Sequence, residues 1–134
     1  MKACTQCGRC CTYAPFMETM QADADDIRRW RREKRNDILM YAYIYDWKPN
    51  SVGRKMSFAF ADLWISPRTN EALGRCPFVR KVRNEDRYKC TIYETRPKAC
   101  REYPIHVQHM AVVDCEMLED GDTDDDVRRF MTGA

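Results

Sequence analysis

The sequence lacks a long hydrophobic run. Its most apolar stretch, residues 38–45, is far shorter than the roughly 20 apolar residues that a helix needs to cross a bilayer, and it ends at Asp46. The first three residues also leave no room for the apolar core of a signal peptide before Cys4. We therefore expect a soluble, cytoplasmic protein with no membrane partner.

Internal repeats and low-complexity linkers are absent too, and the formal net charge is only +2. The 134 residues, 44% of them hydrophobic, suit a single compact domain over residues 1–134. Charge is nevertheless uneven, because residues 28–35 and 75–101 are basic and residues 114–126 are acidic. Such runs are commonly solvated helix faces, and no groove-reading motif accompanies them. Nucleic-acid binding is therefore not expected.

Helical spacing predicts two helices in the first half of the chain. Asp23 or Asp25 can cap the first helix, in which Ile27 and Trp30 recur on one side. The second helix is predicted over residues 37–46, where aromatic and aliphatic side chains fall on one face. Both helices are expected to pack their apolar faces on the core.

The rest of the chain predicts a β-hairpin followed by further helical segments. Alternation of apolar and polar residues indicates the strands, and a proline in a first turn indicates a helix start. The expected elements are a loop at 49–53, a β segment at 58–65, hairpin strands at 78–82 and 88–92 joined by turn residues 84–86, a short helix near Arg96-Pro97, and a terminal helix from residue 127.

Eight cysteines indicate either a disulfide framework or metal ligation, and the expected cytoplasmic location favours metal. The run Cys4-Thr-Gln-Cys7-Gly8-Arg9-Cys10-Cys11 places four thiols within eight residues. A Cys-x-x-Cys turn brings two sulfurs onto one metal, and Gly8 can take a positive φ that turns backbone N–H groups toward sulfur. An isolated pair could be a redox dithiol, but two further thiols favour a metal.

The neighbours Cys10 and Cys11 are informative because side chains of adjacent residues diverge in helical and in extended backbone. They are not expected to bind the same single ion. Two arrangements stay open. One is a pair of neighbouring metal sites or a polynuclear cluster, and the other is a single four-ligand site with one cysteine left over.

Further ligands are expected from the predicted hairpin and from the short helix after it. Cys115 is equally well a small buried hydrophobe, and His106 and His109 are more often polar side chains than ligands. The candidate metal ligands are Cys4, Cys7, Cys10, Cys11, Cys76, Cys90 and Cys100. We thus expect an α+β fold, a small single domain of two or three helices with a short β-hairpin, organised around a cysteine-rich metal site.

Two blocks of sequence carry a family resemblance. Residues 4–11 form a Cys-x-x-Cys-x-x-Cys-Cys motif, and residues 76–78 and 90–104 form a second block that ends in Tyr-Pro. In this order the blocks resemble a cysteine-cluster family described as zinc- or iron-chelating, which includes proteins similar to a flagellin lysine methylase. The blocks cover about a third of the chain, with weaker similarity in residues 25–30 and 62–65.

The resemblance implies an iron–sulfur cluster or, alternatively, Zn²⁺ held by cysteine thiolates, and such soft ligands disfavour calcium and magnesium. Two further functions stay open. One is a metal-dependent enzyme, protein-modifying and methylase-like, with an open metal position. The other is a purely structural zinc module that mediates interactions with another protein. Because no glycine-rich strand-to-helix loop for a nucleotide-like methyl donor is present, methylation rests on analogy with the family alone.

Overall fold

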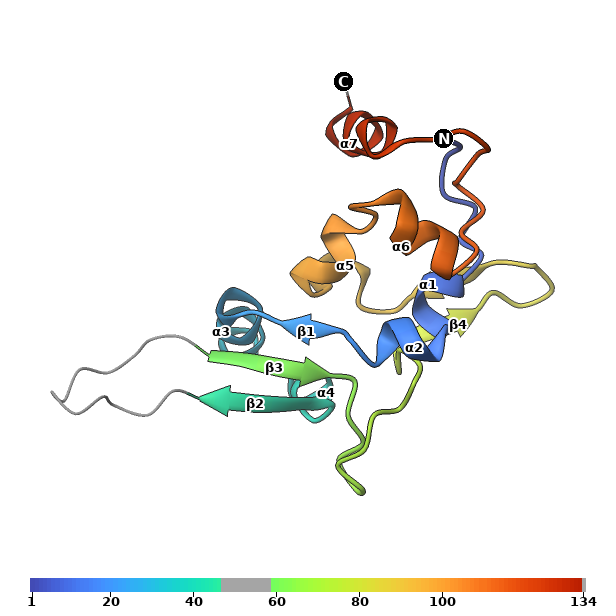
Figure 1. Cartoon of the computed structure of the whole chain (residues 1–134). Helices are drawn as coiled ribbons and strands as arrows, with labels where there is room; N and C mark the ends of the chain where they lie inside the picture. The colour runs from blue at the N-terminus through green and yellow to red at the C-terminus, as the bar shows by residue number, and fades with distance from the viewer. Residues whose placement is uncertain (47–58, 134) are drawn as a thin grey trace, which may run out of the picture.

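The computed structural model describes residues 1–46 and 59–133, which form helices and two small antiparallel sheets (Figure 1). The strand order is β1-β3-β2 in the larger sheet and β4-β5 in the smaller one. This arrangement confirms the α+β class expected from the sequence. The strands are β1 (Gln21–Ala22), β2 (Ala42–Asp46), β3 (Ala59–Leu63), β4 (Val79–Lys81) and β5 (Tyr88–Cys90).

The first long helix, α3 (Ala24–Arg32), confirms the helix predicted after Asp23. Asp23 accepts a hydrogen bond from the backbone N–H of Asp26 at 2.9 Å, and the Asp26 carboxylate accepts one from the backbone N–H of Asp23 at 3.3 Å. This reciprocal capping box satisfies two N–H groups that have no partner inside the helix. Ile27 and Trp30 lie fully buried on its inner face.

The terminal helix, α7 (Asp124–Thr132), begins at a second capping box, formed by Thr123 and Asp126, and buries Val127. It confirms the predicted terminal helix and begins three residues earlier than expected. The remaining helical segments are shorter, so the chain has more of them than the two or three helices predicted. They are α1 (Arg9–Thr12), α2 (Ala14–Met17), α4 (Asn36–Leu39), the 3-10 turn η1 (Tyr93–Thr95), α5 (Lys98–Glu102) and α6 (Val107–Val112).

The helix predicted over residues 37–46 is wrong. Only α4 is helical there, and β2 follows it, paired with β3 so that Ile44 lies opposite Ala61. Tyr43 and Tyr45 are exposed, whereas Ile44 between them packs on the core. This alternation with a period of two is typical of a half-buried strand. The same apolar residues also fit a helical spacing, which is why the sequence predicted a helix.

The predicted hairpin is confirmed in a shorter form, as β4 and β5. Its turn contains Asn84 at a φ of 62°, a left-handed conformation that asparagine tolerates better than most residues. The β segment predicted at 58–65 is confirmed as β3, and the helix predicted near Pro97 is confirmed as α5. The loop predicted at 49–53 lies outside the described residues.

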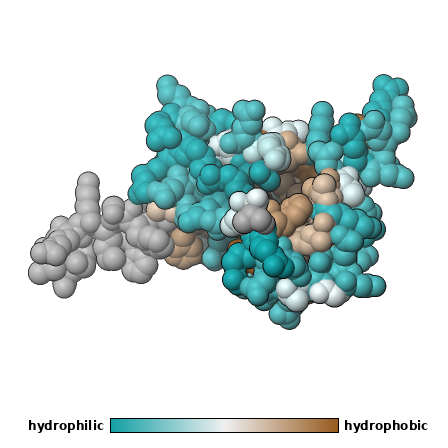
Figure 2. Space-filling view, turned by 90° about the horizontal axis from the view of Figure 1, so that it is seen from above, coloured by the Kyte–Doolittle hydropathy of each residue, from teal (hydrophilic) through white to brown (hydrophobic). Residues whose placement is uncertain are grey.

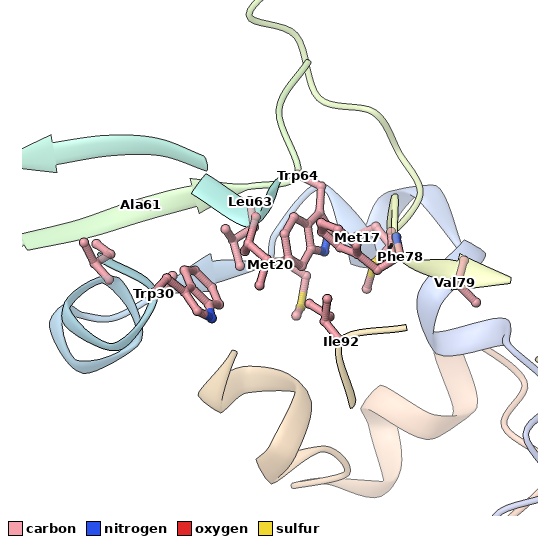
Figure 3. Close-up of a cluster of buried hydrophobic side chains, with 13 residues drawn as sticks. Met17, Met20, Trp30, Ala61, Leu63, Trp64, Phe78, Val79 and Ile92 are labelled. Atoms are coloured by element: carbon pink, nitrogen blue, oxygen red, sulfur yellow. Dashed lines mark hydrogen bonds between the residues drawn. The ribbon is translucent and has the colours of Figure 1, made fainter. Parts of the chain in front are cut away.

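Buried hydrophobic side chains form two clusters. Figure 3 shows part of the larger one, which extends from Trp30 on α3, past Leu63 and Trp64, to Val79 on β4. The sheet-side cluster consists of Met17, Met20, Ala22, Ile27, Trp30, Ile38, Ala61, Leu63, Trp64, Cys76, Phe78, Val79 and Ile92. The C-terminal cluster consists of Met110, Val113, Cys115, Met117 and Val127.

The surface is mainly hydrophilic in the view of Figure 2, where hydrophobic side chains gather around a hollow. The N-terminal segment lies beside the segment that leads into α7 (Figure 1), and the backbone N–H of Lys2 donates to the carbonyl of Met117 at 2.8 Å. Among the described residues, no helix combines the length and the apolar character that a membrane span requires.

Candidate metal centre

All eight cysteines of the sequence line one cavity of about 370 Å³. None of them forms a disulfide. The structure therefore brings together the seven predicted ligands and adds an eighth thiol. The cysteines in the cavity wall are Cys4, Cys7, Cys10, Cys11, Cys76, Cys90, Cys100 and Cys115.

Gly8 shapes the N-terminal cysteine loop. Its φ is 75°, as predicted for this position, and a Cβ at Gly8 would lie 2.5 Å from Cδ2 of Tyr88. The backbone N–H of Tyr88 donates to the carbonyl of Gln6 at 2.7 Å. Only glycine permits both this backbone conformation and this close approach. The loop is thereby fixed on β5, the strand that ends at Cys90.

Cys76 and Cys90 are held against the same loop by the smaller sheet. The backbone N–H of Cys76 donates to the carbonyl of Cys11 at 2.9 Å, and the N–H of Phe78 donates to the Cys76 sulfur at 3.4 Å. In the β4-β5 pair, Cys90 lies opposite Val79. Three cysteines from distant parts of the sequence therefore meet where α1 contacts the hairpin.

Cys100 is positioned by a buried carboxylate on α3. Asp26 is fully buried, and both of its carboxylate oxygens accept the backbone N–H of Lys98 at 3.1 Å, at the start of α5. Arg29 donates to the carbonyls of Thr95 and Arg96, at 3.1 and 2.9 Å. These bonds fix the turn that precedes the Cys100 helix, and they give a structural role to residues 25–30, where the family resemblance is weaker.

Cys115 is the site residue that sequence reasoning did not select. Arg9 donates to the carbonyl of Asp114 at 2.6 Å and forms an ion pair with its carboxylate at 3.0 Å. On the other side of Cys115, Thr5 donates to the Glu116 carboxylate. In the sequence, only the opposite charges of the N-terminal loop and the acidic stretch could have indicated that the two segments meet. They do not indicate that Cys115 lies in the cavity wall.

Burial dominates the protonation of the deeper thiols. It raises the pKa of Cys76 to about 11, and it also raises the pKa of Cys90 and of Cys100. The sulfurs of Cys10 and Cys11 are 3.9 Å apart. Their hydrogen bond lowers the pKa of Cys10 and, together with burial, raises the pKa of Cys11. A bound cation would displace these protons, so metal binding at the cavity is coupled to proton release.

Arg96 places positive charge close to the thiols. Arg96 lines the cavity and lowers the pKa of Cys10 through its charge. Arg9 is instead paired with acidic side chains, and Arg101 lies 3.8 Å from the Asp26 carboxylate. Neither histidine belongs to the cavity wall. The Nδ1 atom of His106 lies 3.6 Å from the Oδ2 atom of Asp124.

The donor set fits a soft metal chemically, since thiolates suit zinc and iron–sulfur clusters. Within residues 1–46 and 59–133, no three His, Cys, Asp or Glu side chains stand close enough to hold an ion as they are. Three sulfurs would therefore have to move closer together to share one ion. The buried indole N–H of Trp64 has no hydrogen-bond partner in the described part of the chain, and the buried Tyr103 hydroxyl lies beside the Cys115 thiol, which together with burial raises the pKa of Tyr103. Both residues line the cavity, so both have hydrogen bonds to offer an occupant.

Comparison with known proteins supports this chemistry. The model of the CxxCxxCC family, described as a "putative zinc- or iron-chelating domain", matches residues 3–117. The match includes both cysteine blocks and extends to Cys115. It confirms the resemblance found in the sequence and supports metal binding in general. Neither the curated proteins nor the solved structures contain a match.

Proposed function

Since this chain belongs to the CxxCxxCC family of zinc- or iron-chelating domains, we propose that its cysteine thiolates hold an iron–sulfur cluster. The observation that carries the proposal is the convergence of eight thiols on one cavity. The reducing cytoplasm suits a protein with this many free thiols, and we place it there. The proposed ligands are drawn from Cys4, Cys7, Cys10, Cys11, Cys76, Cys90 and Cys100.

Ligand number and cavity size favour a cluster over a single ion. A structural zinc takes about four ligands in a tetrahedral arrangement, whereas this wall offers eight sulfurs around about 370 Å³. Apolar side chains such as Phe16, Met20 and Ile92 line the same space and make its wall less polar. Arg96 provides positive charge against the thiolates. When bound, a cluster would supply electron transfer or a Lewis-acidic iron.

Structural zinc is the second candidate, because one feature of the fold favours it. The helices nearest the thiols, α1 and α2, have four residues each, and α5 has five. Helices this short are unstable alone, since isolated helices below about 12 residues are marginal in water. A closed all-thiolate zinc site would tie them together without performing any chemistry.

Elemental and spectroscopic analysis separates the two candidates. We would purify the protein without oxygen, measure iron, acid-labile sulfide and zinc per chain, and record the visible spectrum. Iron with sulfide and broad charge-transfer bands supports the cluster. Colourless protein with stoichiometric zinc supports the structural site. Protein that takes up neither metal under reducing conditions contradicts metal binding through these thiols.

A matched pair of variants ties the metal to the thiols. Cys76→Ser removes a buried sulfur from the cavity wall and should lower the metal content. Ile38→Val removes one methylene from the core and costs about 1 kcal/mol, but Ile38 is not in the cavity wall. Its metal content should equal that of the unmodified protein. Equal loss in both variants would show that metal content follows stability rather than ligation.

A further inference from the structure

The adjacent thiols of Cys10 and Cys11 belong to different halves of the cavity wall. Both residues lie in α1, where neighbouring side chains point about 100° apart. Cys11 packs against the sheet-side cluster, whereas Cys10 packs against the C-terminal cluster. Their sulfurs are still only 3.9 Å apart. The pair therefore marks the boundary between two groups of thiols. In addition to burial, the charge of Cys10 raises the pKa of Cys76, Cys90 and Cys100, so Cys10 lies near both groups.

The first group surrounds Cys11. Cys76 is a member of the sheet-side cluster, and Cys90 and Cys100 pack against it. The backbone bond from Cys76 to Cys11 and the Asp26 contact that positions α5 bring these residues to the same side of the cavity. With Cys11, the group contains four thiols, the number that a tetrahedral ion or one cubane cluster uses.

The second group surrounds Cys10. Cys115 is a buried member of the C-terminal cluster, against which Cys10 packs. Cys4 and Cys7 belong to the loop whose residues 5 and 9 bind the neighbours of Cys115 on both sides. The loop and the Cys115 segment therefore face each other along several residues. This group also contains four thiols.

Each group has one buried donor in the cavity wall. Trp64 is 1% exposed, belongs to the sheet-side cluster, and has no acceptor for its indole N–H among the described residues. Tyr103 packs against the C-terminal cluster, and burial together with the neighbouring Cys115 thiol raises the pKa of its hydroxyl. Orphaned buried donors are rare and need an explanation. Metal-bound thiolates and sulfides accept such hydrogen bonds, which orient them.

We infer that the eight cysteines form two adjacent four-thiolate metal sites. Site A consists of Cys11, Cys76, Cys90 and Cys100, with Trp64 as its hydrogen-bond donor. Site B consists of Cys4, Cys7, Cys10 and Cys115, with Tyr103 as its donor. The inference rests on the metal binding proposed above, and it holds whether each site takes one ion or one cluster. It makes Cys115 a ligand and separates Cys10 from Cys11.

Counting metals on the intact chain tests the inference without any substitution. We would load the reduced protein with Zn²⁺ and measure zinc per chain, then load it with ¹¹³Cd²⁺ and record the cadmium NMR spectrum. Two zinc ions and two cadmium resonances in the all-sulfur range are expected. One ion and one resonance overturn the two-site inference and leave the proposed function intact. If neither Zn²⁺ nor Cd²⁺ binds, the two-site inference is overturned as well, whereas the proposed function fails only if the protein also takes up no iron and sulfide.

Substitutions then assign the two resonances. Cys100→Ala should remove the signal of site A and retain that of site B, and Cys115→Ala should do the reverse. Met117→Leu changes a buried neighbour of Cys115 in the same cluster without removing a thiol, and it should keep both signals. Loss of the same signal in both cysteine variants, or retention of both signals in Cys115→Ala, overturns the inference.

Discussion

The sheet-side half of the molecule and its C-terminal half are held together by different interactions. The sheet-side cluster has thirteen buried members, with Trp30 and Ile38 at 0% exposure. The C-terminal cluster has five, and the N-terminal loop is joined to it mainly by hydrogen bonds and ion pairs such as that of Arg9. Since apolar burial is the dominant favourable contribution to folding, we expect the sheet side to stay folded without metal. We expect the C-terminal half to depend more strongly on metal bound by its thiols.

The largest expected effect comes from truncating the centre of the sheet-side cluster. Trp30→Ala removes a fully buried ring and the hydrogen bond from its indole N–H to the carbonyl of Thr95, at 2.9 Å. Large-to-small substitutions of this kind cost about 3–5 kcal/mol of unfolding free energy. Urea denaturation of metal-free and metal-loaded protein should show the same loss. A loss confined to the loaded protein would contradict the comparison.

Metal removal should loosen the C-terminal half more than the sheet side. A metal present at 100 times its dissociation constant stabilises the region that binds it by about 2.7 kcal/mol, or about 100-fold in the opening equilibrium. After chelation, the amides of Cys115 and Leu118, which donate to Met110 and Cys115, should exchange hydrogen up to about 100-fold faster. The amide of Leu63, which donates to Met20, should accelerate much less, because the larger apolar cluster around it stays packed without the metal of site A. Equal acceleration at both places would show that the two halves unfold as one unit.

Gly8→Ala should act where the two halves meet. The Cβ of alanine would lie 2.5 Å from the Tyr88 ring, so the backbone or the ring must shift. The positive φ of residue 8 also costs a non-glycine residue about 1–3 kcal/mol of folding free energy. We expect lower metal affinity, measured by chelator competition, with a smaller change in the metal-free stability. Gly121→Ala is the control, since it has a positive φ but no atom within 4 Å of the added Cβ.

The sequence predicted local features better than distant contacts. The capping residue Asp23, the hairpin, the positive φ of Gly8 and seven cysteines of the cavity wall all follow from short motifs. Residues 42–46 were misassigned because an aromatic stripe satisfies helical and strand periods alike, and only pairing with β3 decides between them.

The features that sequence reasoning missed depend on contacts across long stretches of chain. Asp26 reaches Lys98, and Arg9 reaches the neighbours of Cys115, 105 residues away. Neither contact has a local pattern, because each side chain is an ordinary helix-capping or loop residue in its own segment. The same holds for Trp64, whose unpaired indole N–H becomes apparent only once the cavity has formed, and for Tyr103, which the fold places beside Cys115.

The smallest expected effect compares two tryptophans that differ in their hydrogen bonding. Trp30→Phe and Trp64→Phe remove similar volume from the sheet-side cluster, but the first loses a satisfied indole bond and the second an orphaned one. Removing an unsatisfied buried donor relieves its desolvation penalty, so metal-free Trp64→Phe should be the more stable variant by about 1 kcal/mol.

Metal loading should reverse that order if the Trp64 N–H donates to a metal-bound sulfur. Hydrogen bonds that orient metal ligands are worth about 10–100-fold in metal affinity, so Trp64→Phe should bind zinc more weakly than Trp30→Phe in competition with a chelator. Equal zinc affinities would remove Trp64 from site A and leave the thiol assignments as they stand. A ¹⁵N-labelled indole signal that moves on zinc binding and disappears in Trp64→Phe would identify the donor directly.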